Sequence, residues 1–394
     1  MSRKPKILFV ISYDAYADIA ARLAPVFLSK GASVQYLFLE RDSGRDIVVN
    51  GTLTKALRKT GEIAHASDAN LAASVRAAAC DVVFFCCSGR RIWNVTREFE
   101  HSDGDRPLFV SCFAGVTLYR QDVGFSHRVA SDIVVFNSKN NVKDYKKFCR
   151  KHGASDENAF LLGFPSLMGV QPRTDVSPSL RTVLFIDQNV VPNSKADRTA
   201  LSRFLVDYAT AWPDRELIVQ CRDHSGHNSA HPPKYQLPKL LLSSSPRGVL
   251  PKNLVVKYDA PQEALGRCDL CLGFASTLLI NAVSRKIPTA IIADFGWKAS
   301  FGNVLFRNSG LEATFDGIRN DVLPTGPDPE WLDANISKPE AALDDLFEIF
   351  VDAAAYKRKP ILNADFAEKY WSGYNIKRRV RFFLRKVRNL FVGG

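Results

Sequence analysis

The chain has 394 residues, of which 46% are hydrophobic and 24% charged, so it can form two to three globular domains and is not wholly disordered. No apolar run reaches the roughly 18 residues that cross a bilayer, and eight scattered cysteines suit a reducing cytoplasm. The net charge of +12 indicates an anionic partner, which leaves nucleic acid, a membrane surface or an anionic substrate open.

Short apolar segments alternate with helical segments through the first 165 residues. The expected strands are residues 6–11, 33–39, 82–87, 107–112 and 132–136, and the expected helices are residues 16–30, 69–79 and 140–152. Gly31 is expected to close the first helix. Near-continuous apolar strands separated by helices imply a parallel sheet that is covered on both faces.

A segment rich in Pro, Gly and Ser follows, and then the alternation starts again. The expected strands are residues 182–186, 216–220, 254–257, 270–273 and 289–293, and the expected helices are residues 195–211, 261–267 and 276–285. The pattern predicts an α/β chain with two Rossmann-like domains facing a cleft. The expected parts are a first domain (1–165), a linker (166–180), a second domain (181–360) and a helical C-terminal segment (361–394).

The excess charge is concentrated at the C-terminus. Residues 371–394 contain seven basic residues and no acidic one, and apolar residues recur there at helical spacing. This pattern predicts a basic amphipathic helix on an anionic membrane, although a helix packed on the protein with a solvated basic face would show it too. The expected membrane contacts are Lys377, Arg378, Arg381, Phe383, Arg385 and Phe391. Nucleic acid is not expected as a partner, because no nucleic-acid-binding motif accompanies the charge.

The segment from Gly273 to Ala282 has the pattern of a ligand site. A strand ends at Gly273, and Ser276 and Thr277 then open a helix. Backbone N–H groups and two hydroxyls at a helix start can bind a phosphate, although an ordinary serine cap would have the same sequence.

A polar loop after the strand ending at Gln220 contains three of the seven histidines, His224, His227 and His231. A histidine here could contact the same phosphate as Ser276. A metal site and a plain solvated loop are the alternatives, and we expect no metal because the spacing includes Gly and Pro. Cys268 and Cys271 form a CxxC that we interpret as the start of a buried strand rather than a redox or zinc site.

The order of these segments resembles the donor domain of GT-B glycosyltransferases, and more narrowly a bacterial family assigned as glycosyltransferases by sequence. The motifs that carry the resemblance are residues 106–111, 114–115, 137–139, 184–188, 253–254, 264–269, 273–277, 287–290 and 294–296. The histidine loop with Ser276 and Thr277 is also similar to bacterial sialyltransferases and Kdo transferases.

In those transferases a histidine and hydroxyls hold the phosphate of a CMP-sugar. The resemblance implies that His231, Ser276 and Thr277 bind the leaving phosphate, where fixed donors stabilise the departing charge. Arg222 and Gln188 complete the expected donor site. Many GT-B enzymes have an acidic residue that binds the nucleotide ribose where this chain has Asn281. Asn281 is expected to hydrogen-bond a donor hydroxyl but carries no charge, so the identity of the nucleotide stays open.

An inverting transferase needs a general base for the acceptor hydroxyl, which we expect in the first domain, facing the cleft. Asp14 follows the first strand and is one candidate, with a helix cap as the alternative role. His127 is the second candidate. Arg90 and Arg128 are expected to bind an anionic acceptor.

We therefore expect a metal-independent GT-B glycosyltransferase without a cofactor, cytoplasmic and peripheral on the inner face of the cytoplasmic membrane. It would move a sugar from a nucleotide-sugar, with a CMP-linked acidic sugar as one candidate, to a capsular, lipopolysaccharide or other cell-surface polysaccharide or to a lipid-linked glycan. The alternatives are a UDP-sugar epimerase on the same fold and a non-catalytic, membrane-associated GT-B scaffold.

Overall fold

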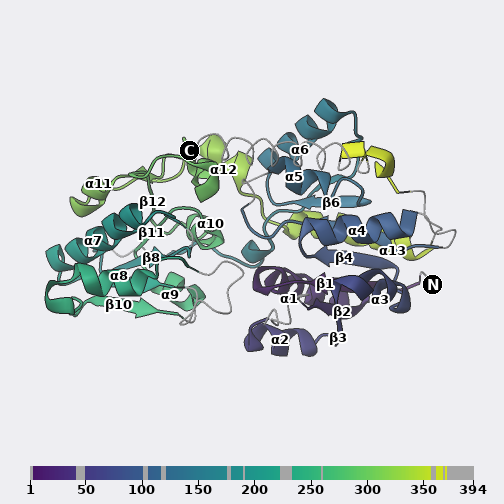
Figure 1. Cartoon of the computed structure of the whole chain (residues 1–394), viewed down its shortest axis with the longest axis horizontal. Helices are drawn as coiled ribbons and strands as arrows, with labels where there is room; N and C mark the ends of the chain where they lie inside the picture. The colour runs from purple at the N-terminus through teal and green to yellow at the C-terminus, as the bar shows by residue number, and fades with distance from the viewer. Residues whose placement is uncertain are drawn as a thin grey trace, which may run out of the picture.

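The computed structural model describes residues 3–40, 49–100, 105–116, 121–174, 179–189, 191–221, 233–258, 261–355, 361–366 and 369–370. Two parallel sheets form the centres of two α/β domains (Figure 1), so the predicted Rossmann-like architecture is confirmed. Arg222, His231 and the six expected membrane contacts after residue 370 lie outside the described residues.

The first sheet has seven parallel strands in the order β3-β2-β1-β4-β5-β6-β7. The strands are β1 (Lys6–Ile11), β2 (Ser33–Leu39), β3 (Glu62–Ala66), β4 (Val82–Cys86), β5 (Leu108–Cys112), β6 (Ile133–Phe136) and β7 (Ala159–Leu161). The helices are α1 (Asp14–Ser29), α2 (Gly51–Arg58), α3 (Leu71–Ala77), α4 (Gly89–Glu100), α5 (Gln121–Ser126) and α6 (Lys139–His152).

The second sheet has six parallel strands in the order β10-β9-β8-β11-β12-β13. The strands are β8 (Thr182–Ile186), β9 (Glu216–Gln220), β10 (Leu254–Lys257), β11 (Leu270–Gly273), β12 (Thr289–Ile292) and β13 (Glu312–Ala313). The helices are α7 (Lys195–Ala211), α8 (Leu237–Ser244), α9 (Pro261–Arg267), α10 (Thr277–Ser284), α11 (Phe315–Arg319), α12 (Pro329–Asn335) and α13 (Leu343–Ala355).

Alternating strand residues build a core on each face of the second sheet. Val183 and Phe185 pack into a cluster with α7 and α8, whereas Leu184 and Ile186 pack into a cluster with α9 and α10. Successive side chains of a strand point to opposite faces, so a strand that is apolar throughout requires helices on both sides.

The first helix shows how sequence spacing sets the packing. Ala17, Ala20 and Phe27 of α1 are buried at helical intervals against the sheet, where Phe9 stacks on Phe84 with ring centroids 5.2 Å apart. Gly31 has a φ of +94°. This left-handed conformation suits glycine and ends the helix as predicted.

Helix α13 follows the second domain in the sequence, but it packs on the first domain. Phe347 and Phe350 join the core of the first domain, with their rings 6.1 and 5.3 Å from that of Phe27. Lys30, the C-cap residue of α1, also pairs with Asp344. Our expected boundary at residue 360 assigned this helix to the second domain, so the structure corrects that assignment for residues 343–355.

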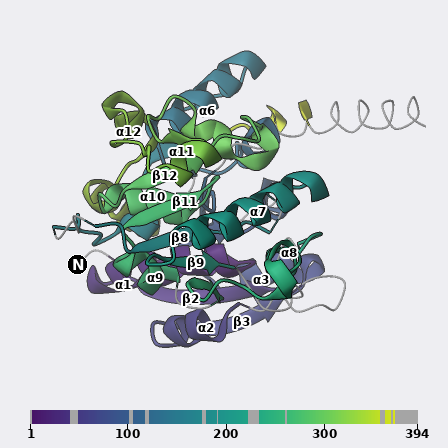
Figure 2. The same ribbon diagram turned by 90° about the vertical axis from the view of Figure 1, so that its left-hand side faces the viewer.

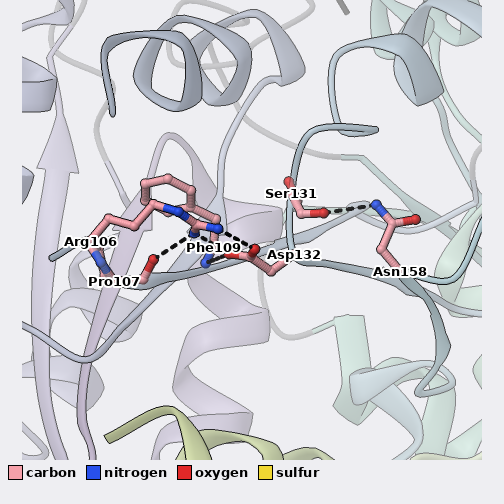
Figure 3. A network of polar contacts seen from close by, with 6 residues as sticks. All are labelled: Arg106, Pro107, Phe109, Ser131, Asp132 and Asn158. Carbon is pink, nitrogen blue, oxygen red and sulfur yellow. Dashed lines mark hydrogen bonds and ion pairs between the residues drawn. The ribbon is translucent and has the colours of Figure 1, made fainter. Parts of the chain in front are cut away.

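Arg106 and Asp132 lie just before β5 and β6, at the amino ends of these two strands, and Figure 3 shows the contacts between them. Arg106 donates from Nη1 and Nη2 to the two carboxylate oxygens of Asp132 at 2.6 and 2.7 Å. Asp132 also accepts the backbone N–H of Phe109 at 2.8 Å. This network joins the start of β5 to the start of β6 and is structural.

The two domains are joined by polar contacts between α6 and α12. Lys139 Nζ lies 2.6 Å from Asp333 Oδ1, and Asn140 Nδ2 donates to Asn335 Oδ1 at 3.0 Å. In the part of the chain that the structure describes, no helix has the length and apolar character needed to cross a membrane.

Candidate functional site

The start of α10 lies on the side of the second domain that meets the first domain (Figure 1). Ser276 is its N-cap, and its hydroxyl accepts the backbone N–H of Leu278 at 3.2 Å. Neither the backbone N–H nor the hydroxyl of Thr277 has a hydrogen-bond partner among the described residues. Two donors therefore remain at the positive end of the helix, where phosphate oxygens bind favourably.

Gln188 fixes the turn that leads into α10. Its side-chain amide accepts the backbone N–H of Ala275 at 2.9 Å and donates to the carbonyl of the same residue. Gln188 lies two residues after the end of β8, the strand next to β11 in the sheet. The structure thus gives Gln188 a positioning role in place of the direct donor contact that we expected.

A buried ion pair lies behind Gln188. Arg198 of α7 is 1% exposed and donates to the carbonyls of Gln188 and Val191, each at 2.9 Å. Its guanidinium also lies 2.9 Å from the carboxylate of Asp187. Burial raises the pKa of Asp187, and the neighbouring charge of Arg198 opposes this shift. Arg198 therefore stabilises the loop after β8 through hydrogen bonds to its backbone carbonyls.

Asn281 is buried with 1% exposure and does not present its amide to a ribose. It donates to the carbonyl of Thr277 at 2.8 Å and to Oγ of Ser166 at 3.2 Å. Ser166 lies in a short 3₁₀ turn, residues Pro165–Leu167, that follows the first domain. The expected ribose contact is therefore replaced by a link between α10 and the linker.

A loop of the first domain lies against the start of α10. A Cβ atom on Gly115, which has a φ of +70°, would lie 3.1 Å from Cγ2 of Thr277. Asn137 holds this loop by donating to the carbonyls of Phe113 and Gly115 at 3.3 and 2.8 Å. The sequence motif 137–139 contained Asn137, but nothing in its spacing indicated that it would support the loop after β5.

The first domain places Asp14 at the carboxyl end of β1. Asp14 is exposed, is the first residue of α1, and accepts the backbone N–H of Asn50 at 2.7 Å. The N-cap is Tyr13. Asp14 is therefore not the cap of this helix, and its carboxylate stays accessible from solvent.

His127 and Arg128 pack against the start of α4. A Cβ atom on Gly89 would lie 2.6 Å from Cβ of His127 and 2.8 Å from Nη1 of Arg128. Burial, followed by the charge of Arg128, lowers the pKa of His127 to about 4. The imidazole is neutral at pH 7, but a base with so low a pKa takes up a proton weakly.

Arg128 is 4% exposed, and its guanidinium is directed at the protein. It donates to the carbonyls of Cys112, Gly124 and Cys87 at 3.0 to 3.2 Å and to the hydroxyl of Tyr16 at 3.1 Å. These contacts tie the carboxyl ends of β4 and β5 to α1, so the expected acceptor contact does not fit Arg128. Arg90, by contrast, is exposed at the start of α4.

The described residues contain no group of three or more His, Cys, Asp or Glu side chains that could hold a metal ion. The eight cysteines are free, and Cys268 and Cys271 are buried at β11, as we interpreted that segment. Since the histidine loop lies outside the described residues, metal independence stays a prediction.

Known structures share this arrangement of two domains. A "putative UDP-N-acetylglucosamine 2-epimerase from Listeria monocytogenes" aligns with a TM-score of 0.56 at 12% identity, covering 94% of this chain and 95% of that one. The calicheamicin glycosyltransferase CalG4 aligns with a TM-score of 0.53 at 12% identity, covering 89% and 99%. An S. aureus MnaA–UDP co-structure aligns with a TM-score of 0.53 at 10% identity, covering 97% of both chains.

At identities of 10–12%, these alignments show that the chain shares the GT-B fold, and they show nothing about its activity. Among curated proteins, no sequence matches this chain. The expected likeness to CMP-sugar sialyltransferases and Kdo transferases has no support in these comparisons. Residues 7–349 match a sequence family, and this match spans most of the chain. The chain therefore belongs to the family described as "Putative glycosyltransferase (DUF6716)".

Proposed function

We propose that this protein transfers a glycosyl group from a nucleotide-sugar to a hydroxyl acceptor, with the donor phosphates at the start of α10. The observation that carries the proposal is the pair of unpartnered donors on Thr277, on a turn that Gln188 fixes and that touches the first domain at Gly115. Two domains that meet at such a turn suit a reaction between a donor and an acceptor.

The contribution of Thr277 to catalysis is electrostatic. As the bond between the sugar and the phosphate breaks, negative charge builds up on the leaving phosphate. Donors that are already held in place stabilise this charge without reorganising. His231 and Arg222 stay proposals for the same phosphate, and Asp14 is the better placed proposal for the acceptor base because its carboxylate is exposed.

The proposal is tested by a thermal-shift screen with UDP, GDP, TDP and CMP, including CMP because a CMP-linked acidic sugar was our expected donor. A nucleotide present at about 100 times its Kd should stabilise the fold by about 2.7 kcal/mol. Thr277→Ala should weaken that stabilisation, and Thr277→Ser, which keeps the hydroxyl, should retain it. A fold that none of the four nucleotides stabilises would contradict the assignment.

A UDP-sugar epimerase is the second candidate, since the Listeria structure carries that description and the fold is shared. Incubation with UDP-N-acetylglucosamine alone separates the two. An epimerase produces the epimer without an acceptor, whereas a transferase leaves the sugar configuration unchanged until an acceptor is added. The acceptor that we propose, a cell-surface or lipid-linked glycan, predicts sugar incorporation into a membrane fraction.

A further inference from the structure

The surface around α8 carries an unusual excess of positive charge. No Asp or Glu occurs between Asp223 and Asp259. Within the described part of this stretch lie five basic residues, Lys234, Lys239, Arg247, Lys252 and Lys257, and none of them forms an ion pair with a described residue. In the same domain Arg267 does pair, at 3.2 Å from Glu216. These five side chains therefore have no ion-pair partner in the part of the chain that the structure describes.

Exposed aliphatic side chains lie among these cations. Leu242 is 44% exposed and Val249 is 68% exposed. Lys239 and Leu242 are three residues apart on α8, so they share one face of the helix. A short 3₁₀ turn, Pro246–Gly248, then carries Arg247 and leads to Val249. We call Lys234, Lys239, Leu242, Arg247, Val249 and Lys252 the α8 patch.

The α8 patch is built on a rigid support. Leu237 and Leu241, on the opposite face of α8, are fully buried in the core of the second domain. The hydroxyl of Ser244 lies 2.7 Å from that of Ser202 on α7. The exposed face is thus presented by a packed helix, and ordering it on binding costs little conformational entropy.

The chemistry of the patch selects its partner. Basic side chains attract the phosphates of a bilayer and of a nucleic acid alike. A bilayer and a nucleic acid differ in how they contact apolar side chains. Aliphatic side chains enter the boundary between headgroups and acyl chains, whereas single-stranded nucleic acids stack on aromatic rings. Both apolar side chains of the patch, Leu242 and Val249, are aliphatic, which favours the bilayer.

The position of the patch agrees with this partner. Figure 2 shows α8 on the right-hand side of the molecule, which is also the side of the last described residues, drawn in yellow. These residues include Tyr370, which packs on Phe148 of the first domain with ring centroids 5.8 Å apart. The basic C-terminal segment begins directly after Tyr370. The α8 patch and the last described residues of the chain therefore lie on the same side of the molecule.

We infer that the α8 patch holds the second domain against an anionic lipid bilayer. This inference concerns a surface apart from the donor site, so it stands whether or not the proposed transferase chemistry is correct. Each basic residue near an anionic surface adds to the attraction, and the apolar side chains add burial.

The test is sedimentation of the full chain with vesicles of phosphatidylcholine containing 30% phosphatidylglycerol, as about a third of anionic lipid gives a strong surface potential. The triple variant Lys239→Glu, Arg247→Glu, Lys252→Glu should lower the partition coefficient at least about tenfold. The matched control reverses three exposed basic residues at the end of α2, Lys55, Arg58 and the C-cap Lys59. It has the same net charge and should change binding less than about twofold.

The double variant Leu242→Ser, Val249→Ser separates lipid from nucleic acid. It should weaken binding to the vesicles about threefold or more, because it removes apolar burial and keeps the charge. The inference is overturned if the patch triple variant binds as the wild type does, or if the α2 control loses as much. Loss of binding to a single-stranded oligonucleotide in the triple variant, with vesicle binding intact in the double variant, would also overturn it. All variants keep the C-terminal segment, so the differences report the α8 patch, and matched melting temperatures show that each variant folds.

Discussion

The side-chain amide of Gln188 forms hydrogen bonds with both backbone polar groups of Ala275. An amide side chain can imitate a neighbouring strand in this way, because it offers one donor and one acceptor in one plane. The turn between β11 and α10 is thereby tied to the loop after β8, and Arg198 holds that loop from behind. The proposed donor site is thus positioned by residues that do not touch the donor.

Replacing Gln188 with Ala should weaken nucleotide binding more than it weakens the fold. The change removes two hydrogen bonds, with an expected loss of about 1–3 kcal/mol in the free energy of unfolding. The freed turn should also misplace the N–H of Thr277, so the Kd for the stabilising nucleotide should rise about tenfold. Urea unfolding and calorimetric titration measure the two effects.

The matched control for this variant is Gln262→Ala on α9. Gln262 is exposed, and among the described residues its side chain accepts a single 3.5 Å contact, from Arg285, so both the stability and the Kd should stay near the wild-type values. If Gln188→Ala binds the nucleotide as tightly as this control does, the positioning role is wrong.

Gly115→Ala should impair activity through the contact with Thr277. The added methyl group would lie 3.1 Å from Cγ2 of Thr277 in the other domain, so the two loops must separate. Gly153→Ala is the control, because Gly153 has the same φ of +70° but no atom within 4 Å of an added Cβ. Both variants should lose about 1 kcal/mol of stability from the left-handed backbone, but only Gly115→Ala should lower turnover.

A second substitution tests whether the methyl contact is the cause. Thr277→Ser removes Cγ2 and keeps the hydroxyl, so Gly115→Ala with Thr277→Ser should recover most of the turnover that Gly115→Ala loses. An unchanged defect in the double variant would assign the effect of Gly115→Ala to its backbone conformation alone.

Much of the fold could be predicted because the buried strands are apolar along their whole length. The segments 6–11, 182–186 and 270–273 become β1, β8 and β11 with the expected bounds. Short or exposed strands were missed, such as β7 with three residues and β3, in which only Ala66 is buried. Too few apolar residues mark such strands in the sequence.

The site was less predictable because side-chain roles depend on tertiary contacts. The spacing around Ser276 and Thr277 indicated a helix start, and the structure has one there. The sequence suggested ligand contacts for Arg128 and for Asn281, yet both are buried, and Arg128 follows helix α5 rather than a strand. The packing of α13 on the core of the first domain also depends on contacts between residues more than 300 positions apart, such as Phe27 and Phe347. Local sequence patterns do not reveal such contacts.

Arg128→Met should destabilise the fold strongly. It leaves the buried carbonyls of Cys87 and Cys112 without the guanidinium donor, and we expect a loss of about 2–4 kcal/mol in the free energy of unfolding. Arg90→Ala, on the exposed start of α4, should change stability by less than about 0.5 kcal/mol. Urea unfolding of both variants decides this, and equal stabilities would contradict the structural role of Arg128.

His127 should make the stability of the protein depend on pH below neutrality. Burial and the charge of Arg128 lower its pKa in the folded protein from 6.5 to about 4, so between these values the unfolded chain binds a proton that the folded protein does not. The free energy of unfolding should therefore fall as the pH falls from 6.5 towards 4, by up to about 3 kcal/mol. In His127→Gln this contribution should vanish, and the difference in urea midpoint between pH 7 and pH 4.5 should shrink. If the variant and the wild type lose stability equally over this range, other groups cause the loss, and His127 is not held neutral by its surroundings.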